Sequence, residues 1–491
     1  MQELAAVALD TARSKGASYA DIRINRYRQQ SLFARENHIQ NAQTLERYGF
    51  GVRVVVDGVW GFAASCRVSK EDIARIAAEA VAIARANRAT RRDPVELVPI
   101  PKAVDTWQTP VVKNPFRVSI GTKADLLLAM NASALKGGAS FVNSAVFCTE
   151  EDKTFASTDG CAINQLLTRV WPFFVVTVVD RASGRFDTRA GLCSPMGTGW
   201  EYVESYPLVA EAALAAEQCR QKQAAKSVAP GKKDLVLSPE HMWLTIHESV
   251  GHPTELDRAL GYEANFAGTS FVTPDQLGKL QYGAAKWMNI VADKTQKDGL
   301  ATCGYDDDGV KTTEFDIVKE GRFVGYQTIR EQVARYGTML GDSRLKACCY
   351  ADDFASVPFQ RMPNVSLRPH DWSGKKVGPE QLVADVKDGV LIEGAGSFSI
   401  DQQRYNFQFG GQVFWEIKNG KKVGMLRDVA YQARTPQFWG SLDMVGSPDF
   451  YKLGGSFFDG KGQPTQTNSV SHGSSWCRFR GVNVINTGRK I

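Results

Sequence analysis

Hydrophobic and polar positions in the first hundred residues predict a helix, a β-hairpin and a second helix. Apolar residues recur at helical spacing between residues 4 and 12, and again along one stripe between residues 73 and 83. Between these helices, the β-branched run 51–56 is followed by Asp57-Gly58, a hairpin turn signal, and then by a second apolar run at 59–62. This part of the chain therefore combines helices with antiparallel strands.

The same mixture continues through the rest of the N-terminal half. Helices are predicted near residues 123–135 and 208–222. Between them lie two strand-like runs, 139–147 and 166–179, in which β-branched and aromatic residues alternate with polar ones. Residues 90–118 contain several prolines and little periodicity, so we interpret them as a connection between modules.

Beyond a basic link at residues 229–233, the chain becomes mostly β. One strand and one helix come first. Short Gly-rich strands follow at residues 394–400, 406–413, 414–417 and 482–485. Asn419-Gly420 lies between two strand-like runs, as the residues of a type I′ hairpin turn do.

The predicted class is therefore α+β, with N-terminal α/β modules that contain antiparallel hairpins, followed by a mostly β C-terminal domain. We place an N-terminal α+β domain at residues 1–228, which could comprise two modules at about 1–100 and 119–228, and a C-terminal β-rich domain at 232–491. The length of 491 residues fits this division, because about 150 residues is typical of one domain.

Composition excludes several classes of protein. Hydrophobic residues make up 43% of the chain and charged residues 23%, which is typical of a globular protein and excludes a largely disordered one. No run approaches the roughly 18–20 apolar residues of a membrane span, so we do not expect this chain to be an integral membrane protein. The net charge of +6 is weak and unclustered, which argues against direct nucleic-acid binding.

The cysteines and the N-terminus favour a cytoplasmic protein. The nine cysteines are odd in number and lack CxxC spacing, which indicates a reducing compartment rather than a disulfide framework. The first residues contain no basic segment followed by an apolar run, so no secretory signal is visible. The alternative is an exported protein whose signal was removed before residue 1.

A cluster of histidines is the strongest chemical feature. The chain has six histidines, and three of them, His241, His247 and His252, fall in one short segment. A buried strand is predicted to lead into a helix that starts at Ser238-Pro239 and carries this segment. His247 and the glutamate after it resemble the HExxH zinc-protease signature, in which histidines at i and i+4 bind metal and the glutamate is a general base.

Here the second histidine lies at i+5, about 140° from the first around a regular α-helix, so the imidazoles converge only if the helix is distorted or ends. Gly251 permits unusual backbone angles, and Pro253 biases His252 away from the α region. The alternative is one surface histidine and one buried, hydrogen-bonded histidine. Glu255 and Asp257 could accept the second N–H of a ligand histidine, or they are solvated loop acids.

The stretch His247-Glu-Ser-Val-Gly-His252, with Glu255-x-Asp257 and Gly268-Thr-Ser-Phe271 after it, resembles the TldD branch of the TldD/PmbA metalloprotease family. That branch carries an HExxxH motif, an acidic pair and a KGTS-like turn. The resemblance extends over most of the chain in the same order. Further matching segments are Gly49–Arg53, Asp306–Gly309, Arg361–Asn364, Gly460–Pro464 and Ser471–Gly473.

The resemblance implies a zinc site in which His247 and His252 are ligands and Glu248 is the general base. The family's third ligand is a cysteine just before the Gly-Lys of its C-terminal segment, and the corresponding residue here is Asp459. His₂-carboxylate is an established zinc ligand set, although a carboxylate is harder than a thiolate and could shift the preference toward another divalent metal. We rank Asp459 first as the remaining ligand, Cys477 second and His472 third.

In function, the resemblance implies a zinc-dependent peptidase that cleaves unfolded peptides or small proteins held in extended form. It also implies a dimer, either of identical chains or with a PmbA-like paralogue. The alternative is a non-catalytic, PmbA-like peptide-binding or partner subunit with a degenerate metal site. The presence of His247, Glu248 and His252 together argues against this alternative. A third hypothesis, modulation of DNA gyrase, has little support from the weak, unclustered charge.

Overall fold

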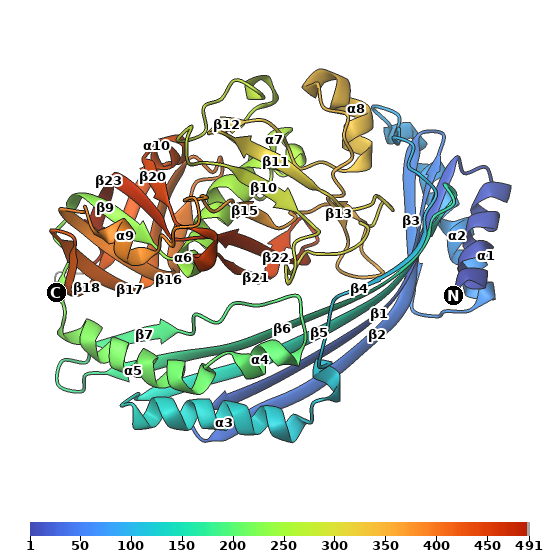
Figure 1. The fold of residues 1–491 in the computed structure, drawn as a ribbon. Coiled ribbons are helices and arrows are strands. Elements are labelled where there is room, and N and C mark those ends of the chain that lie inside the picture. Colours follow the sequence, from blue (N-terminus) through green and yellow to red (C-terminus); the bar gives the residue numbers. More distant parts are fainter. Residues whose placement is uncertain (489–491) are drawn as a thin grey trace.

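The computed structural model describes residues 1–488 and has two parts (Figure 1). A long, curved sheet with flanking helices comes from the N-terminal half, and a β-rich body from the C-terminal half lies over its concave face. The predicted α+β class is confirmed, because helices and mostly antiparallel strands are mixed up to Ala224 and strands dominate afterwards. None of the helices within residues 1–488 is long and apolar enough to cross a membrane.

The N-terminal sheet has seven strands in the order β3-β2-β1-β5-β6-β4, and β7 also pairs with β6. Neighbouring strands are antiparallel except β4 and β6. The strands are β1 (Tyr19–Arg35), β2 (His38–Val56), β3 (Val59–Ser65), β4 (Val104–Gln108), β5 (Phe141–Ser157), β6 (Ala162–Val179) and β7 (Phe186–Ala190). The stretches 1–100 and 119–228 therefore contribute to one sheet.

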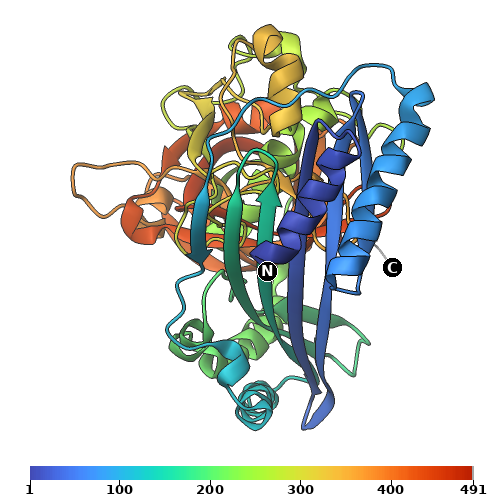
Figure 2. The ribbon, with the colours of Figure 1, turned by 90° about the vertical axis from the view of Figure 1, so that its right-hand side faces the viewer.

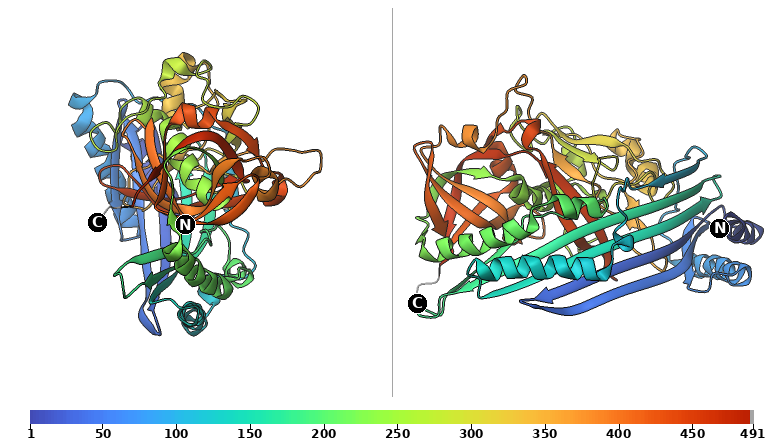
Figure 3. Two further views of the ribbon diagram at one scale, coloured as in Figure 1. Left: turned by 90° about the vertical axis from the view of Figure 1, so that its left-hand side faces the viewer. Right: turned by 60° about the horizontal axis from the view of Figure 1, so that its bottom comes forward.

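Helices cover one face of this sheet. They are α1 (Gln2–Ser14), α2 (Lys70–Ala86), α3 (Ile120–Lys136), α4 (Trp200–Ser205) and α5 (Leu208–Ala224). Helices α1 and α2 pack against one end of the sheet (Figure 2), and α3 and α5 lie side by side along the other end (Figure 3). Helix α2 begins where the Ser69 hydroxyl accepts a hydrogen bond from the backbone N–H of Asp72. The helices predicted from apolar spacing are thus confirmed.

Several strands are longer than predicted, and in β1 buried polar side chains hide the alternation. In β1, Ile22 and Ile24 face the helices, whereas the intervening Asp21, Arg23 and Asn25 face the other way and are equally buried. A second correction concerns the segment 90–118, which we interpreted as a connection only. It contains β4, whose parallel pairing with β6 the prolines on either side of it obscure.

The C-terminal body is built around a closed barrel. Its strands hydrogen-bond in the cycle β16-β9-β23-β19-β17-β16. They are β9 (Gly231–Leu237), β16 (Asp388–Ile400), β17 (Asn406–Lys418), β19 (Val429–Arg434) and β23 (Cys477–Asn486). The predicted hairpin at Asn419-Gly420 is confirmed, since both residues have positive φ and join β17 to β18 (Lys421–Arg427). The two strands predicted over 406–417 are a single strand.

Smaller elements surround the barrel. The remaining strands are β8 (Lys226–Ser227), β10 (Ile290–Asp293), β11 (Glu314–Lys319), β12 (Arg322–Phe323), β13 (Cys349–Tyr350), β14 (Phe359–Gln360), β15 (Val365–Leu367), β18 (Lys421–Arg427), β20 (Leu442–Val445), β21 (Lys452–Lys461) and β22 (Gln466–Ser474). The helices are α6 (Pro239–Ile246), α7 (Leu256–Ala259), α8 (Arg330–Leu340), α9 (Pro379–Val383) and α10 (Thr435–Gly440). Strands β21 and β22 form a separate two-stranded sheet that contacts α6.

Buried ion pairs join the two halves of the molecule. The Lys153 ammonium of the sheet lies 3.0 Å from the Asp307 carboxylate, and Arg53 Nη2 lies 2.7 Å from Asp308 Oδ1. Arg23 Nη1 also approaches Asp307, at 3.9 Å. Burial would raise the pKa of Asp307, but Lys153 and Arg23 hold it below its ordinary value. The Asp-rich segment singled out in the sequence is therefore part of the interface.

Removal of one member of this network should destabilise the whole molecule. We expect Asp307→Ala to lower the free energy of unfolding by about 3–5 kcal/mol, because it leaves buried cations without their partner. The surface variant Glu46→Ala, which breaks an exposed pair with Arg28, should cost about 0–1 kcal/mol. Urea denaturation of the intact chain, followed by fluorescence and circular dichroism, measures both. Equal midpoints for the two variants would contradict the assignment.

Candidate metal centre

A π turn brings the two motif histidines together. Helix α6 starts at Pro239, as predicted, and runs into a π turn at His247–Gly251, in which the backbone N–H of His252 donates to the carbonyl of His247. The extra residue of a π turn places i+5 near the position that i+4 has on a regular helix. The ring centroids of His247 and His252 are consequently 4.5 Å apart.

The predicted convergence through a distorted helix is confirmed, but its expected cause is wrong. Gly251 has φ −56° and His252 has φ −61°, so both stay in the α region rather than adopting unusual angles. Gly251 is required for space instead, because a Cβ atom there would lie 2.5 Å from the Met362 sulfur. The Arg361–Asn364 segment singled out in the sequence thus packs directly against the π turn.

Asp459 faces both histidines. Its Oδ1 atom lies 3.3 Å from His247 Nε2 and 3.8 Å from His252 Nε2. One ligand atom from each of His247, Glu248 and His252 also lies within 4.8 Å of the others, and all these side chains are buried. A β-bulge directs Asp459 here, since Phe457 and Phe458 of β21 together oppose a single residue of β22.

Hydrogen bonds fix the tautomers of both histidines. His472 Nδ1 donates to the Val365 carbonyl at 2.9 Å, so its Nε2 accepts from His247 Nδ1 at 2.8 Å. His252 Nδ1 donates to Glu255 Oε2 at 2.9 Å. The Nε2 lone pairs of His247 and His252 therefore both point at the Asp459 carboxylate.

Such an arrangement calls for a cation. Two imidazole lone pairs and a carboxylate oxygen that converge on one point would repel each other without one, and together they form a His₂-carboxylate metal ligand set. Burial lowers the pKa of His252 to about 4, which favours its neutral, metal-binding form. Burial would also lower the pKa of His247, but the Asp459 carboxylate raises it above its ordinary value. The residues present therefore fit a divalent metal.

A buried network holds the ligands from behind. Lys461 Nζ lies 2.9 Å from both Glu255 Oε1 and Asp257 Oδ2, so Glu255 orients His252 while Asp257 pairs with the lysine rather than with a histidine. Neither acid is a solvated loop residue. Arg361 binds Asp459 Oδ2 at 3.0 Å, which leaves Oδ1 directed at the histidines. Burial opposes ionisation of Asp459, but the histidines and Arg361 hold its pKa well below the ordinary value.

The other two candidate ligands lie elsewhere. His472 lies behind His247 and contacts its Nδ1 atom rather than its Nε2 atom. Cys477 is buried in the barrel core, where its thiol donates to the Ser475 carbonyl and burial raises its pKa. Of the three candidates, Asp459 is the one that the structure brings between the histidines. His241, the third histidine of the cluster, binds the Tyr431 hydroxyl and the Gly394 carbonyl inside the barrel.

Glu248 forms an ion pair with Arg404, a residue that sequence reasoning missed. Arg404 lies in the loop between β16 and β17 and has a left-handed backbone conformation, φ 64°. Burial lowers the pKa of its guanidinium, and Glu248 opposes this shift. No local pattern marks this arginine, since 156 residues separate it from Glu248.

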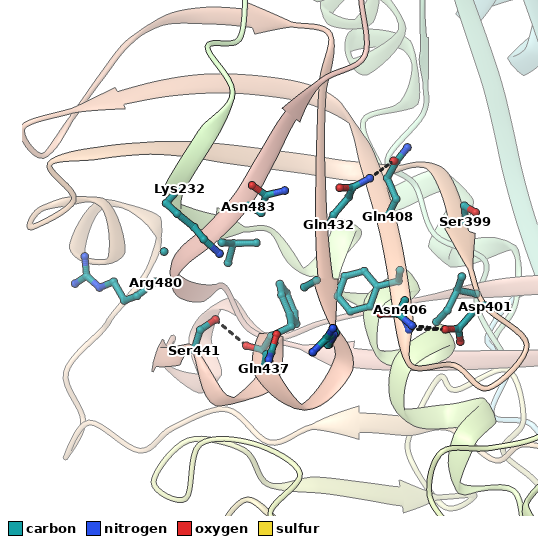
Figure 4. Close-up of a pocket in the computed structure, with 17 residues that line it drawn as sticks. Lys232, Ser399, Asp401, Asn406, Gln408, Gln432, Gln437, Ser441, Arg480 and Asn483 are labelled. Carbon is teal, nitrogen blue, oxygen red and sulfur yellow. Dashed lines mark hydrogen bonds between the residues drawn. The ribbon is translucent and has the colours of Figure 1, made fainter.

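A groove of about 640 Å³ adjoins the same loop (Figure 4). It is lined by polar side chains from neighbouring barrel strands and by α10. Asp401 and Asn406, which flank the loop, form one of its walls and are linked by a 2.6 Å hydrogen bond. Its cross-strand row consists of Ser399, Gln408, Gln432, Asn483 and Lys232, each opposite the next. The groove is not lined by the histidines, Glu248 or Asp459.

Comparisons with known proteins assign the chain's sequence to a family of metallopeptidases. The family described as PmbA/TldA metallopeptidase C-terminal domain matches residues 230–485, which include the whole metal centre, and the family's domain 1 matches residues 20–84. A metalloprotease of Methanothermobacter thermautotrophicus is 25% identical over 469 residues, which cover 96% of each chain. A metalloprotease of Methanocaldococcus jannaschii is 24% identical over 91% of this chain and 93% of its own.

Among solved structures, TldE from Thermococcus kodakarensis superimposes with a TM-score of 0.72 at 13% identity, over 97% of this chain and 98% of that chain. This similarity concerns the fold. Because it covers nearly the whole chain, it includes both the curved N-terminal sheet and the barrel.

Proposed function

Since the chain belongs to the PmbA/TldA metallopeptidase family, we propose that it is a zinc-dependent peptidase that cleaves unfolded peptides or small proteins held in extended form. The observation that carries this proposal is the convergence of two imidazole lone pairs and the Asp459 carboxylate beside Glu248. His247, His252 and Asp459 would hold the metal. We propose zinc as the metal, and a carboxylate ligand is also compatible with another divalent ion.

A bound divalent metal would lower the pKa of a water molecule and polarise the scissile carbonyl. Glu248 takes the proton from the attacking water on its carboxylate and passes it to the leaving nitrogen. His472 and Glu255 hold the imidazoles of His247 and His252 in the required tautomer throughout. The protein itself thus supplies preorganised metal ligands and a base that transfers one proton.

The mode of substrate binding that we propose is addition of a peptide as a β-strand. In support, β21 carries Asp459 and pairs with no strand other than β22 among the described residues. An extended peptide could pair with its other edge through backbone hydrogen bonds. A dimer, of identical chains or with a PmbA-like paralogue, is likewise a proposal that rests on the family. A reducing, cytoplasmic compartment is supported by the nine free thiols.

Chelation tests the proposal directly. We expect the zinc-loaded chain to cleave reduced and alkylated lysozyme, to lose this activity in 1,10-phenanthroline and to regain it when zinc is added. Native lysozyme, which has the same sequence in folded form, is the control and should stay intact. Mass spectrometry of the products measures cleavage. A zinc-loaded chain that leaves both forms intact, alone and with a PmbA-like partner, would favour the non-catalytic subunit instead.

A further inference from the structure

We propose that Arg404 is a catalytic residue that binds the carbonyl oxygen of the substrate, and that the 401–405 loop is built to hold it in place. This inference rests on the proposed peptidase function and names a side chain that would act on the carbonyl oxygen in addition to the metal. Peptide hydrolysis places negative charge on the carbonyl oxygen, and an enzyme gains most from donors that are already aimed at that position.

The guanidinium of Arg404 has unused hydrogen-bond donors. Its Nη1 group pairs with Glu248, whereas Nε is buried and has no partner, and Nη2 has none among residues 1–488. Its side chain is 15% exposed. Among the described residues, Arg23, Arg258 and Arg361 also bury an Nε group without a partner, but both of their Nη groups form hydrogen bonds. Arg404 differs from them because its Nη2 group is free as well within this part of the chain, beside the candidate metal centre. The unused donors therefore indicate a site for an oxygen that arrives with the substrate.

The backbone fixes Arg404 in a conformation that an arginine rarely adopts. With φ 64°, it is in the left-handed region. The Asp401 carbonyl accepts its N–H at 2.9 Å, the Thr435 hydroxyl donates to its carbonyl at 2.7 Å, and the Asp401 carboxylate accepts the N–H of Tyr405. Backbone strain that the surroundings maintain in this way is concentrated at functional sites.

The Gly268–Phe271 segment, which the metal chemistry leaves unexplained, braces this loop. The N–H of Phe271 donates to the Gln403 carbonyl at 2.9 Å, and a Cβ atom on Gly268 would lie 2.5 Å from Gln402. Ser270 Oγ donates to the Pro253 carbonyl at 2.6 Å, directly after His252. The segment thus ties the arginine loop to the end of the helix that carries the metal ligands.

The chemistry balances with Arg404 in this role. As the water oxygen bonds to the carbonyl carbon, the π electrons of the C=O bond move to the oxygen, and Arg404 N–H groups donate to it. Glu248 holds the proton removed from the water. When the C=O bond reforms, the C–N bond breaks and the nitrogen takes that proton. A guanidinium has five N–H donors, so Arg404 can pair with Glu248 and bind the oxygen at once.

The test compares Arg404→Met with Arg434→Met, an exposed arginine at the end of β19. We expect Arg404→Met to lower kcat by about 10²–10³-fold, as loss of one such donor does, with KM changed by less than about threefold. Arg404→Lys should recover part of the loss, and zinc content should stay near that of the wild type. Arg434→Met should leave kcat and KM unchanged. Equal kcat in the wild type and Arg404→Met would overturn the inference.

A binding measurement separates this inference from the proposed function. N-phosphoryl-leucyl-tryptophan carries a tetrahedral anionic group, and calorimetry should show it binding the zinc-loaded wild type about 10²-fold more tightly than zinc-loaded Arg404→Met. If the wild type binds this probe more tightly than Arg404→Met but cleaves no peptide, the peptidase proposal fails while the oxygen site of Arg404 stands. If both proteins bind the probe equally, or neither does, the Arg404 inference fails whatever the activity.

Discussion

Glu248→Gln should leave the chain folded and loaded with zinc while peptide cleavage falls by about 10²–10⁴-fold, which is the usual contribution of a general base. Glutamine has the shape of glutamate and can still accept a hydrogen bond from Arg404, but it cannot take a proton. The substitution therefore removes only the ability of this side chain to accept a proton. Steady-state kinetics on reduced and alkylated lysozyme, with zinc content by elemental mass spectrometry, measures both parts of this expectation.

Glu240→Gln is the matched control for this variant. Glu240 belongs to the same helix segment and pairs with Lys452 instead of facing the histidines. Its replacement should leave kcat and zinc content unchanged. Cleavage by Glu248→Gln at the rate of the Glu240→Gln protein would remove Glu248 from the role of base. Loss of zinc from Glu248→Gln would instead make the glutamate a ligand.

Asp459→Asn should weaken zinc binding by more than about 100-fold, because loss of a group outside the ligand set already costs 10–100-fold. The amide is a poor ligand, and it no longer neutralises a metal bound by His247 and His252. Asp459→Cys restores the thiolate that the family resemblance places at this position. We expect it to bind zinc and to discriminate more strongly against manganese, since a thiolate is the softer ligand.

Cys477→Ser separates this assignment from its competitor. Because the Cys477 thiol lies in the barrel core and contacts Ser475, its replacement should leave zinc content near one per chain. Equilibrium dialysis with elemental mass spectrometry compares the wild type and the three variants. Zinc loss from Cys477→Ser together with full zinc in Asp459→Asn would reverse the ranking of ligands. Because Asp459→Asn leaves Arg361 without its carboxylate partner, circular dichroism is used to check that this variant is folded.

The parts of the fold that local chemistry determines are the ones that sequence reasoning found. Helix α2 has a Ser69 cap and a continuous apolar stripe, and the β17–β18 hairpin has an Asn-Gly turn, so each carries its own signal. No such local signal in the sequence indicated how long β1 is. Its polar face is buried against the other half of the molecule, and ion pairs across that interface replace the usual alternation.

The candidate site divides in the same way. His247, Glu248 and His252 lie within one short segment, so the sequence alone pointed to them. Asp459 was predicted from the resemblance to a family. Nothing local showed that a bulge directs Asp459 toward the histidines or that Arg404 pairs with Glu248, because strand register and loop packing bring these residues together over long separations. The sequence predicted that a distorted helix brings the two histidines together, but it did not predict the cause. Gly251 is needed because a larger residue would clash with Met362.

The π turn at His247–Gly251 can also be understood as a one-residue insertion that does not move the ligands. An α-helix with the HExxH spacing and this helix with HExxxH present two imidazoles in similar directions, since the wider turn accommodates the added residue. Spacing in sequence and spacing in space are therefore separable at metal sites. Searches of genomes for metal-binding helices that require four-residue periodicity would pass over this one, and allowing one extra residue where a glycine ends the segment would recover it.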